Sequence, residues 1–170
     1  LSFMGYDVRI PVMKLRQFWQ MLAHTHGQLT NFSQLAMNME LSRQSVRKYL
    51  DILQETFMIR QLQPFHANLK KRLVKSPKIF IRDSGIYHTL MGINAFQELA
   101  GHSSLGMSWE GFCLEQILSQ LPRSWNAFFY RTQAGAEVDL ILQRRFGEAR
   151  IFVEFKYSQT PKLTKGFWEA

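Results

Sequence analysis

The apolar positions at the start of the chain recur with the spacing of an amphipathic helix. Within residues 11–26 they stand at i, i+3, i+4 and i+7, and the side chains are Leu15, Phe18, Trp19 and Leu22. Pro11 suits the first turn of such a helix, and Gly27 marks its end. We therefore predict a first helix in this segment.

Two shorter helical patterns follow, and together they predict a helix-turn-helix. The segment 31–39 has Asn31 as its expected N-cap, and Ser42 is the expected N-cap of the next helix. The apolar face of that second helix would consist of Val46, Tyr49, Leu50, Leu53 and Phe57. Its outer face would present four polar side chains to base edges and phosphates, which are Arg43, Gln44, Arg47 and Lys48.

The pattern then changes from helical to extended. The segments 58–65 and 76–83 predict two strands that enclose a basic stretch. A helix-turn-helix followed by a two-stranded wing is a winged helix, a module that binds DNA, binds protein or joins domains. The basic cluster of the wing contains Lys70, Lys71, Arg72, Lys75 and Lys78. Three roles are open for it: salt-dependent phosphate binding, a solvated face, or contact with another module of the protein.

The second half of the chain alternates between helical and extended patterns. Glycine-containing breaks in residues 84–107 predict a connecting region, which Asp83 precedes as the expected cap of a helix. A helix is expected over 108–122, and its apolar pattern predicts that Cys113 is buried. A strand over 127–133 and a turn then lead to two further strands, joined by a turn, in residues 137–156.

Composition places the chain among globular proteins with a polyanionic partner. Hydrophobic residues make up 46% of it, and no apolar run approaches the roughly 20 residues that cross a bilayer. One cysteine excludes an internal disulfide and fits a reducing cytoplasm. The formal net charge of +8 favours DNA as the partner, although a general solubility charge would have the same sign. The chain opens without an initiator methionine, and we expect it to be part of a longer protein.

Against this basic background, carboxylates recur at alternate positions of the last two predicted strands. Residues two apart share a face of a strand, so Glu137 and Asp139 face one way together with Ile141. On the next strand Glu154 and Lys156 share a face, and antiparallel pairing would bring them to Asp139. A divalent cation relieves the repulsion between such carboxylates, and their oxygens suit Mg²⁺ or Mn²⁺. The alternative is a solvated strand face that carries an ion pair.

An aspartate followed on the next strand by Glu-x-Lys resembles the core of the PD-(D/E)xK nucleases. In that superfamily a carboxylate on the preceding helix often completes the metal site, and Glu110 stands in the matching place. The resemblance implies that Glu110, Asp139 and Glu154 hold Mg²⁺ or Mn²⁺. It also implies that Lys156 positions water for phosphodiester cleavage, so that all four residues are catalytic.

The order of the segments along the chain resembles a family as well. The segments "KRLVKSPKIFIRDSG", "WEGFCLEQIL", "FYRTQAGAEVD" and "VEFK" are similar to the C-terminal region of bacterial AAA-type ATPases with an uncharacterised C-terminal domain. The resemblance covers nearly all of the chain and implies an α+β fold. Its parts would be a winged helix over 1–83, a connecting region over 84–107 and an incomplete PD-(D/E)xK restriction-endonuclease-like lobe over 108–170.

The same resemblance implies an ATPase module as a partner within the same protein. Because the chain has no G-x-x-x-x-G-K-[ST] segment, ATP would be bound by that module alone. The expected function is a DNA-associated region of the ATPase with metal-dependent nuclease activity. The alternative is a module that binds nucleic acid or protein without cleavage. An exposed edge of the incomplete sheet could also pair with another chain and form a homo-oligomer.

Overall fold

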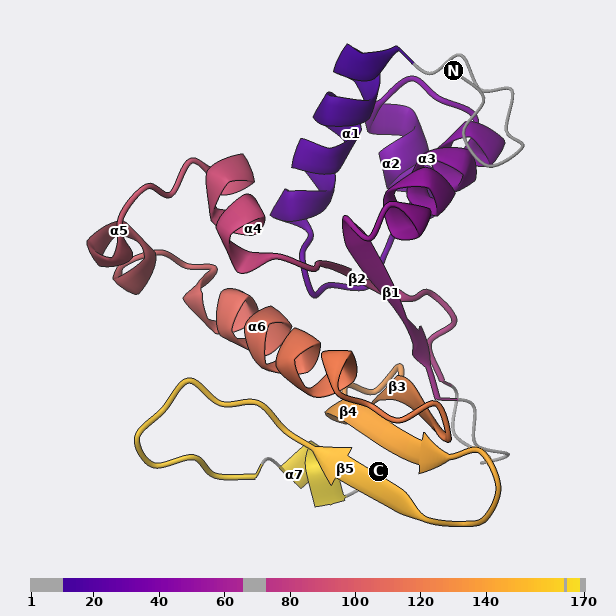
Figure 1. Ribbon diagram of the computed structural model, residues 1–170, viewed down its shortest axis with the longest axis vertical. Coiled ribbons are helices and arrows are strands. Elements are labelled where there is room, and N and C mark those ends of the chain that lie inside the picture. The colour runs from indigo at the N-terminus through magenta and orange to yellow at the C-terminus, as the bar shows by residue number, and fades with distance from the viewer. Residues whose placement is uncertain (1–10, 66–72, 164, 169–170) are drawn as a thin grey trace.

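The computed structural model describes residues 11–65, 73–163 and 165–168. Three helices form a bundle at one end of the molecule (Figure 1): α1 (Val12–His24), α2 (Phe32–Asn38) and α3 (Arg43–Glu55). Asn31 and Ser42 cap α2 and α3 as predicted, because each side chain accepts a hydrogen bond from a backbone N–H of the first turn. Both helices therefore begin directly after the N-cap residues that the sequence predicts.

The bundle buries most of the apolar positions that the sequence predicts. The fully buried side chains in its core include Phe18, Leu22, Val46, Leu50 and Leu53. Phe57 is an exception, since it is 71% exposed. Helix α3 has ended before it, and a φ of 61° places Phe57 in the left-handed region. Its ring therefore lies at the surface, 5.4 Å from the guanidinium carbon of Arg82, and the prediction that it is buried is wrong.

A five-stranded sheet follows the bundle and runs in the order β2-β1-β3-β4-β5. The strands are β1 (Ile59–Pro64), β2 (Lys78–Ile81), β3 (Trp125–Arg131), β4 (Glu137–Arg144) and β5 (Arg150–Val153). All neighbouring pairs are antiparallel except β1 and β3, which are parallel. The predicted wing strands β1 and β2 thus belong to the same sheet as the three strands of the second half. The wing residues Lys70, Lys71 and Arg72 lie outside the described residues.

Helices cover both faces of this sheet, and the α+β prediction is confirmed. The remaining helices are α4 (Ser84–Met91), α5 (Phe96–Ala100), α6 (Leu105–Ser119) and α7 (Lys165–Trp168). Helix α6 lies along one face of the sheet (Figure 1). There Leu114 packs with Phe129 and Leu140, whereas Phe167 of α7 packs with Val138 on the other face. The predicted connecting region contains α4, which Asp83 caps, and α5. The division of the chain at residues 83 and 107 stays a prediction.

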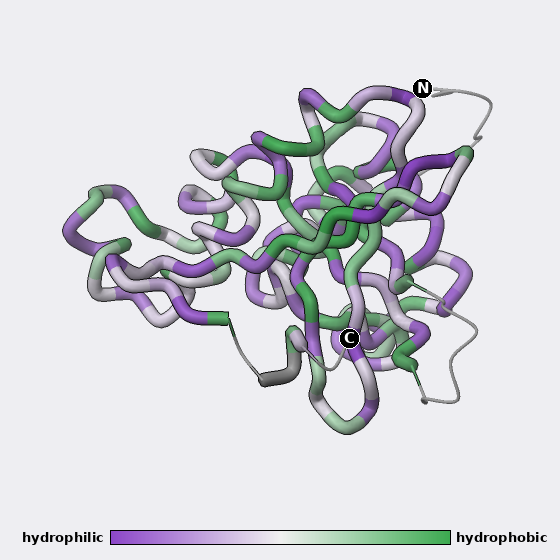
Figure 2. Tube along the Cα trace, turned by 90° about the horizontal axis from the view of Figure 1, so that it is seen from below, coloured by the Kyte–Doolittle hydropathy of each residue, from purple (hydrophilic) through white to green (hydrophobic). Residues whose placement is uncertain are grey.

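The apolar segments converge where the helices meet the sheet. Figure 2 shows the hydrophobic stretches gathered in the middle of the trace, with hydrophilic stretches mostly on the outer loops. Among the residues that the structure describes, no helix is both long and apolar enough to span a bilayer.

Helix α6 is held against the rest of the molecule by ion pairs and by small residues on its buried face. The Glu115 carboxylate, on the buried face of α6, accepts hydrogen bonds from the guanidinium groups of Arg60 and Arg82. The same face presents Ser108 and Gly111, so Cys113 is only half-buried. The prediction that Cys113 is buried is therefore wrong, since its side chain is partly exposed.

His26 occupies the junction between α1, β2 and α6. Its Nδ1 accepts a hydrogen bond of 3.0 Å from Ile81 N, and its ring stacks on Tyr87 with the centroids 4.2 Å apart. Burial lowers the pKa of His26 to about 4, so the ring is neutral when it accepts this bond. Gly111 of α6 lies directly against the ring, which leaves no room for a side chain there.

Replacement of Gly111 by alanine is expected to destabilise the fold by about 1–3 kcal/mol, because overpacking forces the His26 ring to move. The added Cβ would lie 2.3 Å from His26 Nε2. Gly106 of the same helix is the control, since no described atom would lie within 4 Å of its added Cβ. Gly106→Ala is expected to stabilise by up to about 1 kcal/mol. Urea unfolding measures both changes, and equal stability of the two variants would contradict the tight contact.

Candidate functional site

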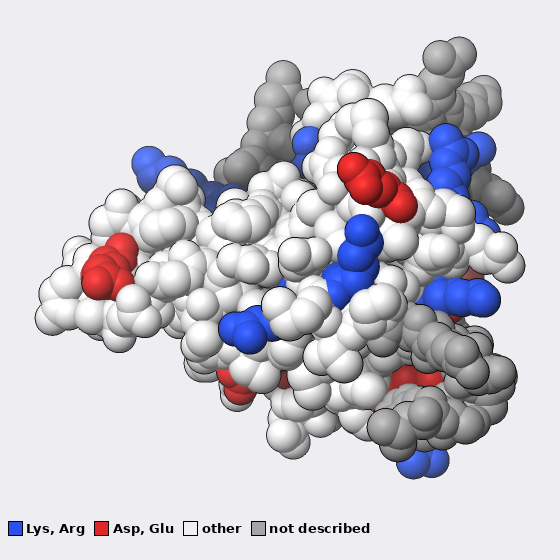
Figure 3. Space-filling view, turned by 90° about the horizontal axis from the view of Figure 1, so that it is seen from above, with Lys and Arg blue, Asp and Glu red and all other residues white. Residues whose placement is uncertain are grey.

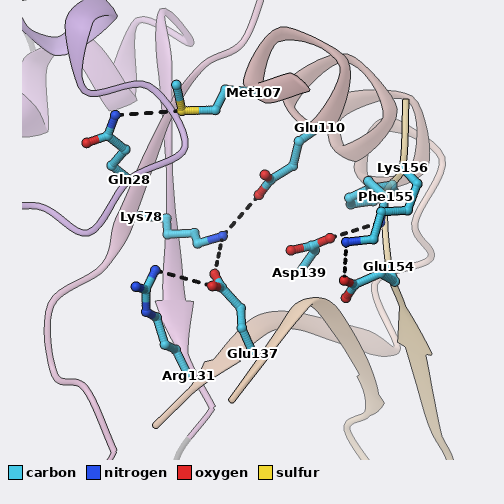
Figure 4. Close-up of polar contacts among 10 residues, drawn as sticks. All are labelled: Gln28, Lys78, Met107, Glu110, Arg131, Glu137, Asp139, Glu154, Phe155 and Lys156. Carbon is cyan, nitrogen blue, oxygen red and sulfur yellow. Dashed lines mark hydrogen bonds and ion pairs between the residues drawn. The ribbon is translucent and has the colours of Figure 1, made fainter. Parts of the chain in front are cut away.

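A polar cavity of about 550 Å³ lies between the α1–α2 loop, α6 and β4. Glu110 of α6 and Asp139 of β4, two of the four predicted catalytic residues, both line it. Gln28 lies on the loop side, where its amide donates a hydrogen bond to the sulfur of Met107 across the cavity wall (Figure 4). The predicted pair of acidic residues from helix and strand therefore meets at one place.

A β-bulge in β4 directs Asp139 into this cavity. Phe128 pairs with Ile141 and Tyr130 pairs with Val138, so two residues of β4, Asp139 and Leu140, stand opposite the single residue between them on β3. A bulge of this kind shifts the alternation of side chains by one position. Glu137 and Asp139 do share a face, as predicted, but Ile141 packs on the opposite face with Val138. The prediction that Ile141 shares the acidic face is wrong for this reason.

Asp139 also ends strand β5. Its Oδ2 accepts a hydrogen bond of 2.9 Å from Phe155 N, so this N–H bonds to a side chain instead of to the β4 backbone. The β4–β5 ladder consequently stops at the pair Leu140 and Val153. Glu154 and Lys156 lie just beyond the strand, and their predicted place within it is wrong. Their side chains remain beside Asp139, as Figure 4 shows.

Glu154 and Lys156 form a partly buried ion pair. Lys156 Nζ lies 2.6 Å from Glu154 Oε1, and the Glu154 side chain is only 6% exposed. The other oxygen, Glu154 Oε2, is buried and accepts no hydrogen bond from any described residue. A buried carboxylate oxygen without a donor is costly, and a cation would relieve that cost. This half of the site therefore has an unused acceptor beside Asp139.

Lys78 of β2 lies on the other side of the cavity. Its Nζ is 3.0 Å from Glu110 Oε1 and 2.8 Å from Glu137 Oε1, and its side chain is 3% exposed. Glu137 in turn pairs with Arg131, with 3.2 Å between Oε2 and Nη1. Lys78 is thus not part of an exposed basic cluster, as the sequence suggested, because carboxylates from two elements, α6 and β4, enclose its ammonium group. The apolar run Ile79–Ile81 indicates a buried strand, but it does not tell whether the neighbouring Lys78 faces water or carboxylates.

Burial and mutual repulsion raise the pKa values of the carboxyl groups in this cavity. Burial raises the pKa of Glu110 to about 7, against the lowering effect of Lys78, and the charge of Asp139 adds to the rise. Burial also raises the pKa of Asp139, which the hydrogen bond from Phe155 opposes and the charge of Glu154 supports. The pKa of Lys78 lies above its ordinary value, since its two carboxylate partners outweigh the effect of burial. Additional positive charge would therefore be favourable near Asp139.

The donor set fits a hard divalent cation at Asp139 and Glu154. Both residues offer carboxylate oxygens, which are the ligands that Mg²⁺ and Mn²⁺ prefer, and Glu154 Oε2 is the unpartnered one. Within the described part of the chain, no group of three or more His, Cys, Asp or Glu side chains is arranged to hold a metal ion. The predicted convergence of Glu110 with the other two carboxylates on one ion stays a prediction.

The predicted DNA-contacting residues of α3 lie on a separate surface. Arg43, Gln44, Arg47 and Lys48 are all exposed. Arg43 and Arg47 line a polar cavity of about 630 Å³ that also includes Asn31, Ser33 and Ser76, and Arg43 donates a hydrogen bond to Ser33 Oγ. Figure 3 shows that basic side chains gather at the right margin of the face seen from above, with few acidic ones among them. Lys75 is exposed in the loop before β2.

Comparisons with known proteins match the two halves of the chain to different families. Residues 3–97 match the model of a family described as Domain of unknown function (DUF8612), and residues 105–170 match one described as Domain of unknown function (DUF4143). Two curated relatives, each named an uncharacterized protein, come from Mycobacterium bovis and Mycobacterium tuberculosis. Each is 40% identical over 166 residues, which cover 96% of this chain and 36% of the relative. The chain thus spans about a third of the length of these relatives, and no solved structure matches it.

The pH dependence of stability is expected to reveal the raised pKa of Glu110. The folded value of about 7 exceeds the ordinary 4.5, so the carboxyl stabilises the fold at low pH, and this contribution is lost as the pH rises between these values. The side chain of the Glu110→Gln variant is neutral at every pH in this range. The stability of this variant relative to the wild type should therefore rise across the same window, by up to about 3 kcal/mol. Urea unfolding at several pH values measures the difference, and a pH-independent difference would contradict the assignment.

Proposed function

We propose that this chain, which belongs to the family described as Domain of unknown function (DUF8612), is a DNA-associated region of a bacterial AAA-type ATPase and carries a metal-dependent nuclease site. The order of its elements supports this proposal. Helices α2 and α3 with the β1–β2 pair suit a winged helix, and α6 with β3, β4 and β5 suits a PD-(D/E)xK-like lobe. The match of residues 105–170 to DUF4143 also supports it, since that domain is often found in C-terminal regions of AAA ATPases.

The bulge in β4 is the observation that carries the nuclease proposal. It turns Asp139 toward the side of the sheet that α6 covers, where Asp139 shares a cavity with Glu110. The Asp139 carboxylate also bonds to Phe155 N, which keeps Glu154 and Lys156 beside it. Bulges occur often next to active sites because they redirect one side chain without breaking the sheet. The place of Asp139 in one cavity with Glu110 therefore supports a role in chemistry beside its contact with Phe155 N.

Each of the four residues has a role that its surroundings suit. Asp139 and Glu154 would hold the cation through their carboxylate oxygens, and Glu110 would assist from the opposite wall of the cavity. Lys156, whose side chain is 34% exposed, would orient a water molecule or contact a phosphate oxygen. Bound Mg²⁺ or Mn²⁺ would supply Lewis-acid polarisation of a phosphate and a lower pKa for bound water. The substrate class is therefore a phosphodiester.

The remainder of the proposal concerns partners. The curated relatives are nearly three times as long as the matched region, which leaves room for an ATPase module that binds ATP. Ile151 and Phe152 are 48% and 42% exposed on β5, which is the last strand of the described sheet. That edge suits pairing with a second chain. The net charge of +8 suits DNA, and a cytoplasmic location remains part of the proposal.

Cleavage of DNA by the complete protein with Mg²⁺ or Mn²⁺ is the direct test. Asp139→Asn and Glu154→Gln are each expected to reduce cleavage by at least about 100-fold, because changes even beyond the ligands of a metal cost about 10- to 100-fold. Glu148→Gln is the matched control, since Glu148 is exposed in the turn between β4 and β5 and should not affect cleavage. Equal cleavage by the wild type and Asp139→Asn would contradict the proposal. Absence of cleavage by the wild type on single-stranded, duplex and branched DNA would contradict it as well.

A binding module without catalysis is the second candidate, and the polar cavity at the start of α3 favours it. Arg43 and Arg47 line this cavity, and among the described residues neither arginine forms an ion pair with a carboxylate. Both guanidinium groups are therefore available for phosphate oxygens, which they can bind in a bidentate way. DNA binding through α3 requires no intact metal site.

Arg47→Ala is expected to weaken DNA binding and to reduce the slope of log affinity against log salt concentration by about one, because one phosphate contact is lost. Fluorescence anisotropy with labelled duplex DNA, without divalent cations, measures both quantities. Arg123→Ala is the control, since Arg123 is exposed in the loop after α6, away from the cavity. An unchanged affinity and slope for Arg47→Ala would exclude this surface as the binding site.

A further inference from the structure

Lys78 holds its ammonium group where an acidic metal site would hold a cation. Its Nζ lies between Glu110 Oε1 and Glu137 Oε1, at 3.0 and 2.8 Å, and the side chain is 3% exposed. Figure 4 shows the ammonium between Glu110 and Glu137, with Asp139 farther from it, toward Glu154 and Lys156. The ring of Phe129, whose centroid is 5.5 Å from Nζ, adds a further favourable contact for a cation.

The position of this lysine in the chain makes the arrangement specific. The carboxylates that it joins come from α6 and β4, whereas Lys78 itself comes from β2, a strand of the predicted wing. Backbone pairing holds Lys78 in place from two sides, since it is bridged to Leu29 and paired with Leu62. The backbone from which the ammonium extends is therefore fixed opposite the carboxylates of α6 and β4.

The two halves of the acidic site are thus compensated differently. Glu110 and Glu137 already have a positive charge within 3.0 Å of each carboxylate. Glu154 has the Lys156 ammonium 2.6 Å from its Oε1, but its buried Oε2 has no described donor, and Asp139 accepts a hydrogen bond from a single backbone N–H. An ion at Asp139 and Glu154 Oε2 would displace neither ammonium, but an ion that reached Glu110 Oε1 would have to displace that of Lys78. Loss of that ammonium contact in a buried site costs several kcal/mol.

We propose that the Lys78 ammonium takes the place of a second divalent cation, so that the site binds one ion, at Asp139 and Glu154, and Glu110 is held by Lys78. This inference rests on the proposed metal site and specifies how many ions it holds. Lys78 is then a positioning residue that acts on Glu110 and Glu137. It also explains how the described carboxylates can include no group of three that could hold one metal ion.

The stoichiometry of Mn²⁺ binding tests the inference. Equilibrium dialysis of the complete, nucleotide-free protein is expected to find one ion per chain in the wild type. Lys78→Met removes the charge at similar length and leaves Glu110 and Glu137 facing each other. This variant is expected to bind two ions, and its melting temperature should rise more with Mn²⁺ than that of the wild type, because a ligand stabilises the state that binds it. The double variant Lys78→Met/Glu110→Gln is expected to bind one Mn²⁺ ion per chain again.

Each alternative outcome separates the inference from the proposed function. Two ions in the wild type, or one ion in a folded Lys78→Met variant, would overturn the inference and leave the metal site intact. If the wild type binds no ion, the proposed metal site and the inference are both overturned. Asp139→Asn is the control for the place of a bound ion, since an ion held at this site should be lost in that variant. A Lys78→Met variant that stays unfolded at every Mn²⁺ concentration, by circular dichroism, would also overturn the inference, since Mn²⁺ is expected to replace the lost charge.

Discussion

A buried ammonium group must be paired, and the pairing of Lys78 determines how the halves of this molecule meet. Lys78 lies on β2, and its counter-charges, Glu110 and Glu137, lie on α6 and β4. The contact is therefore satisfied only when β2 and β1 join the sheet beside β3 and when α6 lies across it. Because an isolated charge in the interior is far more costly than a paired one, this contact disfavours arrangements in which the wing strands stand apart from the second lobe. Glu115 adds to it, since it joins α6 to Arg60 and Arg82.

The bulge in β4 is the second constraint, and it acts on the site itself. With regular alternation, Asp139 and Leu140 would point to opposite faces of the sheet. With two residues opposite one, Asp139 lines the acidic cavity while Leu140 still packs with Leu114 of α6. The same carboxylate takes the next N–H of β5 and ends that strand. One local irregularity thereby brings Asp139, Glu154 and Lys156 together from two segments of the chain.

These two constraints place an acidic cavity beside a helix that has a basic face. The exposed arginines of α3 lie close in sequence to the α1–α2 loop, and Leu29 of that loop lines both the acidic cavity and the cavity of Arg43 and Arg47. A polyanion held by the arginines would therefore lie beside the wall of the acidic cavity. In the proposed function, the helix-turn-helix part would bind the backbone of the substrate and the cavity would act on a phosphate nearby.

The sequence by itself determined most of the elements, their order and the residue types of the acidic site, but not helix α5 within the connecting region or the end of β5 before Glu154. The caps Asn31, Ser42 and Asp83, the buried faces of α1 and α3, and the strands around Asp139 follow from local preferences and periodicity, which act over a few residues. The outward position of Phe57, the bulge at Asp139 and the burial of Lys78 were not predictable in this way. The left-handed Phe57 ends α3 in a local turn, where Met58 N bonds to Leu53 O, but the sequence has no glycine there to mark it. The extra residue in β4 depends on pairing with β3 and is not visible in local periodicity. Whether a lysine in a basic stretch faces water or carboxylates was decided only when β2, α6 and β4 came together, since only then did its counter-charges exist.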